Sequence, residues 1–217
     1  MSTSEARRRA LTSRPALLVV DVQRSFGDPD YLGEWGLSDA ASAAIAAAVS
    51  SCDTLVADAR AAGVPVYWIE LATDPARPWR ASSWLRTGDL DAPLAADEPC
   101  VAGTPGAEWF VLAPGEGEPR IRKRGYSGFR GTDLEQRLRE DRIGWVAVAG
   151  LTTECCIAAT ATDAFQLDWP VLVPRDATAA YDLDLHENAL AQLALTAAEV
   201  CTTDDLAALW RTTGGSA

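Results

Sequence analysis

Histidine is nearly absent, since His186 is the only one in 217 residues. A zinc site built from cysteine and histidine needs several such ligands, and the sequence contains no CxxC pair. A Ser-His-Asp or Cys-His mechanism would have to use His186 alone, and its place at the start of a predicted helix favours a structural role. We therefore expect neither a metal nor a cofactor.

We also expect no disulfide framework, secretion signal or membrane span. The five cysteines are odd in number and irregularly spaced: Cys52, Cys100, Cys155, Cys156 and Cys201. The first residues, MSTSEARRRA, are polar and basic. No run approaches the roughly 20 apolar residues that cross a bilayer. We expect a cytoplasmic protein without a membrane partner.

Positive charge is scarce, with 19 lysines and arginines against 31 aspartates and glutamates, a net charge of -12. Such a surface repels phosphate backbones, so nucleic acid is not expected as a partner. Hydrophobic residues make up 48%, which suits a chain that buries a core. The length predicts one domain over 1–217, with flexible termini at 1–13 and 212–217.

Apolar runs and helical segments alternate along the chain. Strands are predicted at 16–22, 64–71, 119–123, 144–150, 170–174 and near 199–201, and helices at 39–62, 132–138, 153–167, 185–197 and 203–211. This alternation predicts a Rossmann-like α/β fold, a central mostly parallel sheet of about six strands with helices on both faces. Segment 72–118, rich in proline, is too long for a plain connection and is predicted to line the site or a subunit interface.

Three polar features follow predicted strands, where α/β folds place their chemistry. Asp21 ends ALLVV, and it is either a functional carboxylate or a structural one that bonds loop amides. Lys123 lies between two arginines, and it is either surface charge or turned inward by strand alternation. The Cys155–Cys156 pair opens a predicted helix, where a cysteine is either a nucleophile or a small apolar side chain.

Together, three segments resemble the isochorismatase-like cysteine hydrolases: VVDVQRSF, KRGYSGFRGTDL and GLTTECCIAATATDAF. They match the DxQxxF, KxxxSxFxGTxL and GxxTxxCVxxTxxDA patterns of that family in order, with Ile157 in place of the usual valine. The resemblance runs from about 15 to 210 and is weakest in 72–118. Within 72–129 it favours the branch that includes N-carbamoylsarcosine amidohydrolase.

The resemblance implies a catalytic triad of Asp21, Lys123 and Cys156, with Cys155 as packing. It also implies a cis peptide bond between Leu151 and Thr152, and an oxyanion hole formed by the backbone N–H groups of Thr152 and Cys156. We expect Lys123 and the helix N-terminus to lower the pKa of Cys156.

Several residues are candidates for substrate contact. These are Gln23, Phe26, Trp79, Trp84, Tyr126 and Phe129. Arg80 and Arg86 either meet a substrate carboxylate or lie at the surface. Family members that act on nicotinamide usually hold a metal through an aspartate and two histidines near the end of the second strand. This chain has no histidine there, which disfavours a metal and nicotinamide.

These features predict a cysteine hydrolase that cleaves a C–N bond of a small amide, carbamoyl or ureido compound through a thioester. One alternative is an isochorismatase-type vinyl ether hydrolase, which needs the aspartate but no thiol. Another is a non-catalytic binding protein, which would be expected to have lost one of the three residues. The resemblance implies a homodimer or homotetramer.

Overall fold

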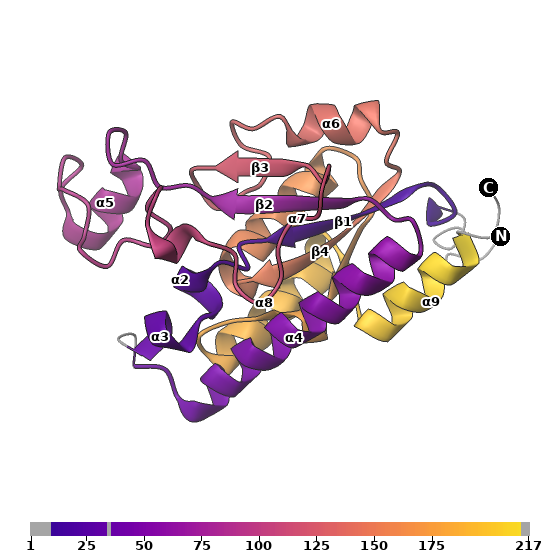
Figure 1. The fold of residues 1–217 in the computed structure, drawn as a ribbon, viewed down its shortest axis with the longest axis horizontal. Coiled ribbons are helices and arrows are strands. Elements are labelled where there is room, and N and C mark those ends of the chain that lie inside the picture. Colours follow the sequence, from indigo (N-terminus) through magenta and orange to yellow (C-terminus); the bar gives the residue numbers. More distant parts are fainter. Residues whose placement is uncertain (1–9, 34–35, 214–217) are drawn as a thin grey trace.

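A seven-stranded sheet forms the centre of the computed structural model, which describes residues 10–33 and 36–213 (Figure 1). The strand pairings that build it are all parallel within these ranges. The order is β3-β2-β1-β4-β5-β7, and β6 pairs with β4. The strands are β1 (Pro15–Val20), β2 (Val66–Leu71), β3 (Arg120–Lys123), β4 (Trp145–Leu151), β5 (Val171–Pro174), β6 (Thr178–Ala179) and β7 (Glu199–Cys201).

The predicted parallel α/β fold is thus confirmed, with one strand more than expected. The additional strand, β6, has only two residues and no apolar run that would reveal it in the sequence. Strand β1 is buried on both faces, which explains its continuous apolar sequence.

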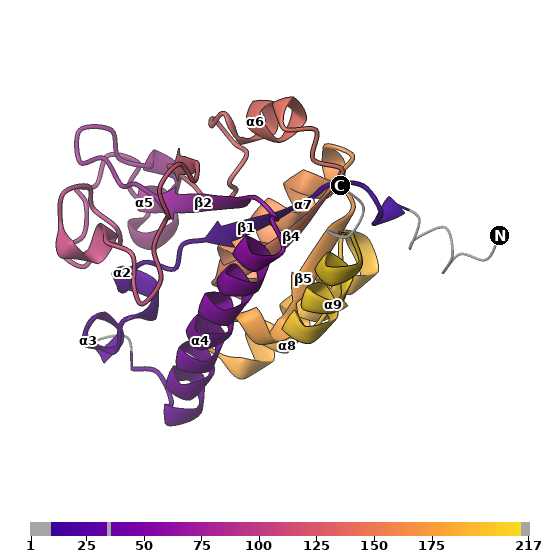
Figure 2. The same ribbon diagram turned by 45° about the vertical axis from the view of Figure 1, so that its right-hand side comes forward.

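Helices cover both faces of the sheet, as Figures 1 and 2 show. Alternate residues of β1 face opposite sides, so Leu17 and Val19 pack in one core, and Leu18 and Val20 in the other. On the first side lie α4 (Asp39–Ala61) and α9 (Thr203–Thr213); on the second lie α6 (Leu134–Glu140), α7 (Ala158–Gln166) and α8 (Leu183–Thr196).

Helix α4 corrects one expectation, because its length and mean hydropathy of 1.5 meet the usual criterion for a membrane span. Its many alanines raise the mean hydropathy without a continuous run of large apolar side chains. Its buried side chains, among them Ile45, Val49 and Leu55, pack in the core on the sheet. A core helix of a soluble fold passes the same test.

The chain between β2 and β3, which we call the excursion (residues 72–119), lies beyond the carboxyl ends of these strands (Figure 1). It contains α5 (Arg80–Thr87) and the 3₁₀ turn η2 (Pro105–Ala107). Two short helices that we did not predict lie near it: α2 (Arg24–Gly27) and α3 (Pro29–Leu32).

Within segment 1–13, where we predicted a flexible terminus, Leu11 and the Ser13 carbonyl contact the fold. Leu11 is buried in the core, and the Trp145 indole donates a hydrogen bond to the Ser13 carbonyl over 3.0 Å. Residues 1–9 and 214–217 of the predicted flexible termini lie outside the described ranges.

Candidate active site

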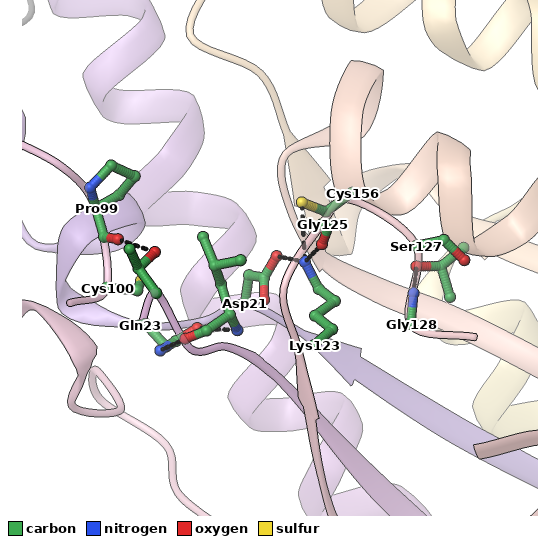
Figure 3. Close-up of polar contacts among 12 residues, drawn as sticks. Asp21, Gln23, Pro99, Cys100, Lys123, Gly125, Ser127, Gly128 and Cys156 are labelled. Carbon is green, nitrogen blue, oxygen red and sulfur yellow. Dashed lines mark hydrogen bonds and ion pairs between the residues drawn. The ribbon is translucent and has the colours of Figure 1, made fainter. Parts of the chain in front are cut away.

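Three side chains that are far apart in the sequence meet at the carboxyl edge of the sheet (Figure 3). The Lys123 ammonium lies 2.6 Å from Asp21 Oδ2 and 3.2 Å from Cys156 Sγ. It also donates a hydrogen bond to the Gly125 carbonyl over 2.9 Å. Asp21 and Lys123 are fully buried and Cys156 is 6% exposed. A buried acid, ammonium and thiol therefore form one cluster.

Strand alternation turns Lys123 inward. Along β3, Arg120 and Arg122 are exposed, while Ile121 and Lys123 are buried. The two arginines bond the buried Glu70 carboxylate over 2.7 and 2.8 Å on the other face of the sheet. The lysine between two arginines is therefore not surface charge.

Cys156 is placed by the turn that follows β4. The Leu151–Thr152 peptide bond is cis, and a π-helical turn, η3 (Thr153–Ile157), leads into α7. The Thr153 hydroxyl bonds Thr178 and His186 Nδ1, each over 2.8 Å. His186 thus supports the turn that carries the thiol.

The electrostatics of the cluster differ from our expectation of a low pKa for Cys156. The contact with Cys155, burial and the charge of Asp21 raise the pKa of the Cys156 thiol well above its usual value, outweighing Lys123. Burial also raises the pKa of Asp21, although Lys123 opposes this. Burial disfavours the Lys123 charge, but Asp21 and Cys156 outweigh it and raise the pKa of Lys123. These directions favour the protonated thiol of Cys156, with Lys123 as the charge partner of Asp21.

A cavity of about 650 Å³ opens over the cluster and exposes Cys155 and Cys156 to ligands. Of the predicted contact residues, Phe26, Trp79 and Tyr126 line it, as does Arg86. Trp79 and Tyr126 pack edge to face with ring centroids 4.9 Å apart. The excursion therefore contributes to the wall of this cavity.

Four other candidates do not line the cavity, because each is either exposed or engaged with another part of the fold. Trp84 is 55% exposed, and Arg80 pairs with Asp91 over 2.9 Å. Phe129 is buried and stacks on Trp169 with centroids 5.9 Å apart.

Gln23 is the fourth, and its side-chain amide is engaged by backbone. It accepts a hydrogen bond from Leu71 N–H and donates to the carbonyls of Leu71 and Ala107. Gln23 therefore connects the ends of β1 and β2 with the excursion.

Sequence reasoning missed several lining residues, among them Glu154, Arg124 and Tyr181. Glu154 occupies a variable position of the cysteine motif, and Arg124 directly follows Lys123. Tyr181 lies just after β6, the strand that the sequence did not reveal. For Glu154 and Arg124, position just after the carboxyl end of a predicted strand was the available signal, and for Tyr181 there was none.

The metal centre that the resemblance associates with nicotinamide-cleaving members does not fit this chain. The residues after β2 are Ala72, Thr73 and Asp74, and Asp74 pairs with Arg77 over 3.1 Å. The single histidine bonds Thr153. Across 10–33 and 36–213, no group of three histidines, cysteines, aspartates or glutamates is arranged to hold a metal ion.

The fold and site define an α/β domain with a buried Asp–Lys–Cys cluster under a cavity at the carboxyl edge of a parallel sheet. Residues 15–205 match the family model of the isochorismatase domain, so the chain belongs to the isochorismatase family.

Similar proteins include several named hydrolases. The chain is 32% identical over 193 residues to the ureidoacrylate amidohydrolase RutB of Methylobacterium radiotolerans, covering 82% of this chain and 72% of that one. A cysteine hydrolase structure from Pseudomonas syringae pv. phaseolicola has a TM-score of 0.78 at 26% identity, covering 94% of both chains. The N-carbamoylsarcosine amidase of Thermoplasma acidophilum shares the fold, with a TM-score of 0.67 at 23% identity over 88% of this chain and 97% of that one.

Proposed function

We propose that this protein is an amidohydrolase that cleaves a non-peptide C–N bond in a small amide, carbamoyl or ureido compound. The observation that carries the proposal is the position of the Lys123 ammonium between Asp21 and Cys156, at 2.6 and 3.2 Å, beneath the cavity. The likeness to a ureidoacrylate amidohydrolase over most of the chain supports this bond type.

The proposed reaction starts from the neutral thiol. Asp21 takes the thiol proton as sulfur attacks the substrate carbonyl, and its raised pKa suits a base that must later release this proton. The proton then passes to the leaving nitrogen as the C–N bond breaks. Water, deprotonated by Asp21, cleaves the thioester and restores the thiol. Lys123 compensates the carboxylate charge and stabilises the thiolate as it forms.

The backbone N–H groups of Thr152 and Cys156 are the proposed donors to the oxyanion. The Thr152 carbonyl accepts hydrogen bonds from the N–H groups of Cys155 and Ile157, over 3.2 and 3.1 Å. The Cys156 N–H does not donate to the Thr152 carbonyl. It lies at the start of the helix, where a developing negative charge is stabilised.

Ammonia release tests the proposal. Screening carbamoyl amines, ureido acids and simple amides should reveal a substrate for the wild type. Cys156→Ala should then lower kcat by at least ~1000-fold because the nucleophile is gone. Cys155→Ala is the matched control, and most of the activity should remain because Asp21 and Lys123 are in contact with Cys156. Equal losses from both variants, or full ammonia release by Cys156→Ala, would contradict the assignment of Cys156 as the nucleophile.

A further inference from the structure

Glu154 has a carboxylate that its surroundings satisfy only in part. It lies in η3, two residues before Cys156, and lines the cavity. Its Oε1 atom accepts a hydrogen bond from the Thr152 hydroxyl over 3.0 Å. Its Oε2 atom is buried and has no hydrogen-bond partner in another described residue. A buried carboxylate oxygen without a partner is costly, and a ligand that donates to it would recover this free energy.

The other charged groups of the cavity wall do not neutralise Glu154. Asp74 and Glu98 are paired with Arg77 and Arg86, over 3.1 and 2.6 Å. Within the described chain, Asp97 and Glu154 have no ion-pair partner, and Arg124 is the lining cation without a carboxylate partner. Two unpaired acids against one unpaired cation leave the wall with an excess of negative charge.

The remaining wall suits a cation as well. Phe26 and Tyr181 line the same cavity as Cys156, and aromatic faces attract ammonium groups. The chain as a whole carries a net charge of -12, which draws cations toward its surface. The volume of about 650 Å³ leaves room for a substituent beyond an amide or urea group.

We propose that the substrate carries an ammonium group and that Glu154 binds this group beside the scissile carbonyl. The inference rests on the proposed amidohydrolase function and narrows its substrate class to amino-substituted amides or ureido compounds. Glu154 is close to the reacting carbonyl because its Oε1 bonds the Thr152 hydroxyl, and the Thr152 N–H is a proposed oxyanion donor.

Matched substrates test this inference. Amides of increasing chain length would be compared in three forms, with a terminal ammonium, a methyl or a carboxylate group. A hydrogen bond to a charged group contributes ~1.5–3 kcal/mol, so wild-type kcat/KM should favour the ammonium form over the methyl form by ~10–100-fold. Glu154→Gln should reduce this ratio by at least ~10-fold. Glu116→Gln removes an exposed carboxylate outside the cavity and should leave the ratio unchanged.

An unchanged ratio in Glu154→Gln, or a wild-type preference for the carboxylate form, would overturn the inference, the latter in favour of binding by Arg124. If no amide is hydrolysed, the proposed function fails, and thermal shifts test the cation site alone. Pentylammonium should then raise the Tm of the wild type more than pentanol or pentanoate does. If Glu154→Gln does not fold, the wild-type thermal shifts still test whether the cavity binds an ammonium group. Equal shifts from the three compounds would refute the site.

Discussion

Lys123 is the residue on which the charge balance of the cluster depends. Its ammonium is fully buried and lies against a fully buried carboxylate. Removing one member of such a pair leaves an uncompensated charge in the interior, which costs about 3–5 kcal/mol. Replacing Lys123 should therefore lower the free energy of unfolding as well as the activity.

Lys123→Met should destabilise the fold by about 3–5 kcal/mol at pH 8 and by less at pH 5. Without the ammonium, the folded-state pKa of Asp21 rises further above the unfolded value of 3.8. A carboxyl with a raised folded-state pKa costs stability as pH rises from the unfolded value toward the folded one. The loss should therefore grow with pH over this window, as urea unfolding at the two pH values would measure.

The double variant Lys123→Met with Asp21→Asn is the matched control, because it removes both charges. Its stability should exceed that of Lys123→Met at pH 8 and should lack the extra pH dependence. Equal destabilisation of Lys123→Met at pH 5 and pH 8 would show that lost packing, rather than the unpaired Asp21, causes the effect.

Among the elements, the pairing of β1 with β4 holds Asp21 and Cys156 together. Val20 pairs with Gly150. Asp21 directly follows Val20, and Leu151, which begins the turn that carries Cys156, directly follows Gly150. Gly150 has φ +121°, and an added Cβ would lie 2.0 Å from the Val20 carbonyl oxygen. Only glycine permits this close approach of the two backbones.

Gly150→Ala should therefore destabilise the protein by about 2–5 kcal/mol and lower kcat, because β1 must shift near Asp21. Gly117→Ala is the matched control: Gly117 has φ +80° but open space around it, so it should lose only about 1 kcal/mol. Chemical denaturation and ammonia release measure the two effects. Similar losses from both variants would show that the backbone angle, and not the contact with Val20, sets the cost.

The same elements show what sequence reasoning can reach. Strands such as β1 and β4 are buried on both faces, so their apolar runs are continuous and easily read. Alternation in β3 allowed an inward Lys123 as one of two interpretations of the sequence, and the burial pattern of the strand selects it. The helices α2 and α3 have four residues each, too few for a helical period, and β6 has two.

Side chains in the site were less predictable than strands. Phe129 and Tyr126 belong to one motif, yet Phe129 packs on Trp169 and Tyr126 lines the cavity. Nothing local distinguishes these two aromatic residues, because the partner of Phe129 lies 40 positions further along the chain. The pKa of Cys156 was likewise hard to predict, since the contact with Cys155, burial and the Asp21 charge act against Lys123 and raise this pKa.

At the scale of the whole molecule, the site depends on how the excursion is attached to the sheet. Gln23 bonds the backbone of Leu71 at the end of β2 and of Ala107 in the excursion. Backbone contacts run beside it, with Arg24 N–H donating to the Glu108 carbonyl and Phe110 N–H to that of Val22. One buried amide thus links three segments that are distant in the sequence.

Gln23→Leu should loosen the excursion more than it destabilises the whole fold. The substitution keeps the approximate side-chain volume but leaves partly buried backbone groups of Leu71 and Ala107 without their partner, at a cost of about 1–3 kcal/mol. Trypsin should then cleave faster after arginines of the excursion such as Arg77 and Arg86, and KM should rise because the cavity wall is less ordered. Gln136→Leu, which removes an exposed glutamine that bonds Glu140 on α6, is the matched control. It should change neither the rate of tryptic cleavage nor KM. If Gln23→Leu instead lowered activity at an unchanged rate of cleavage, Gln23 would act on the substrate, as the sequence suggested, rather than through the excursion.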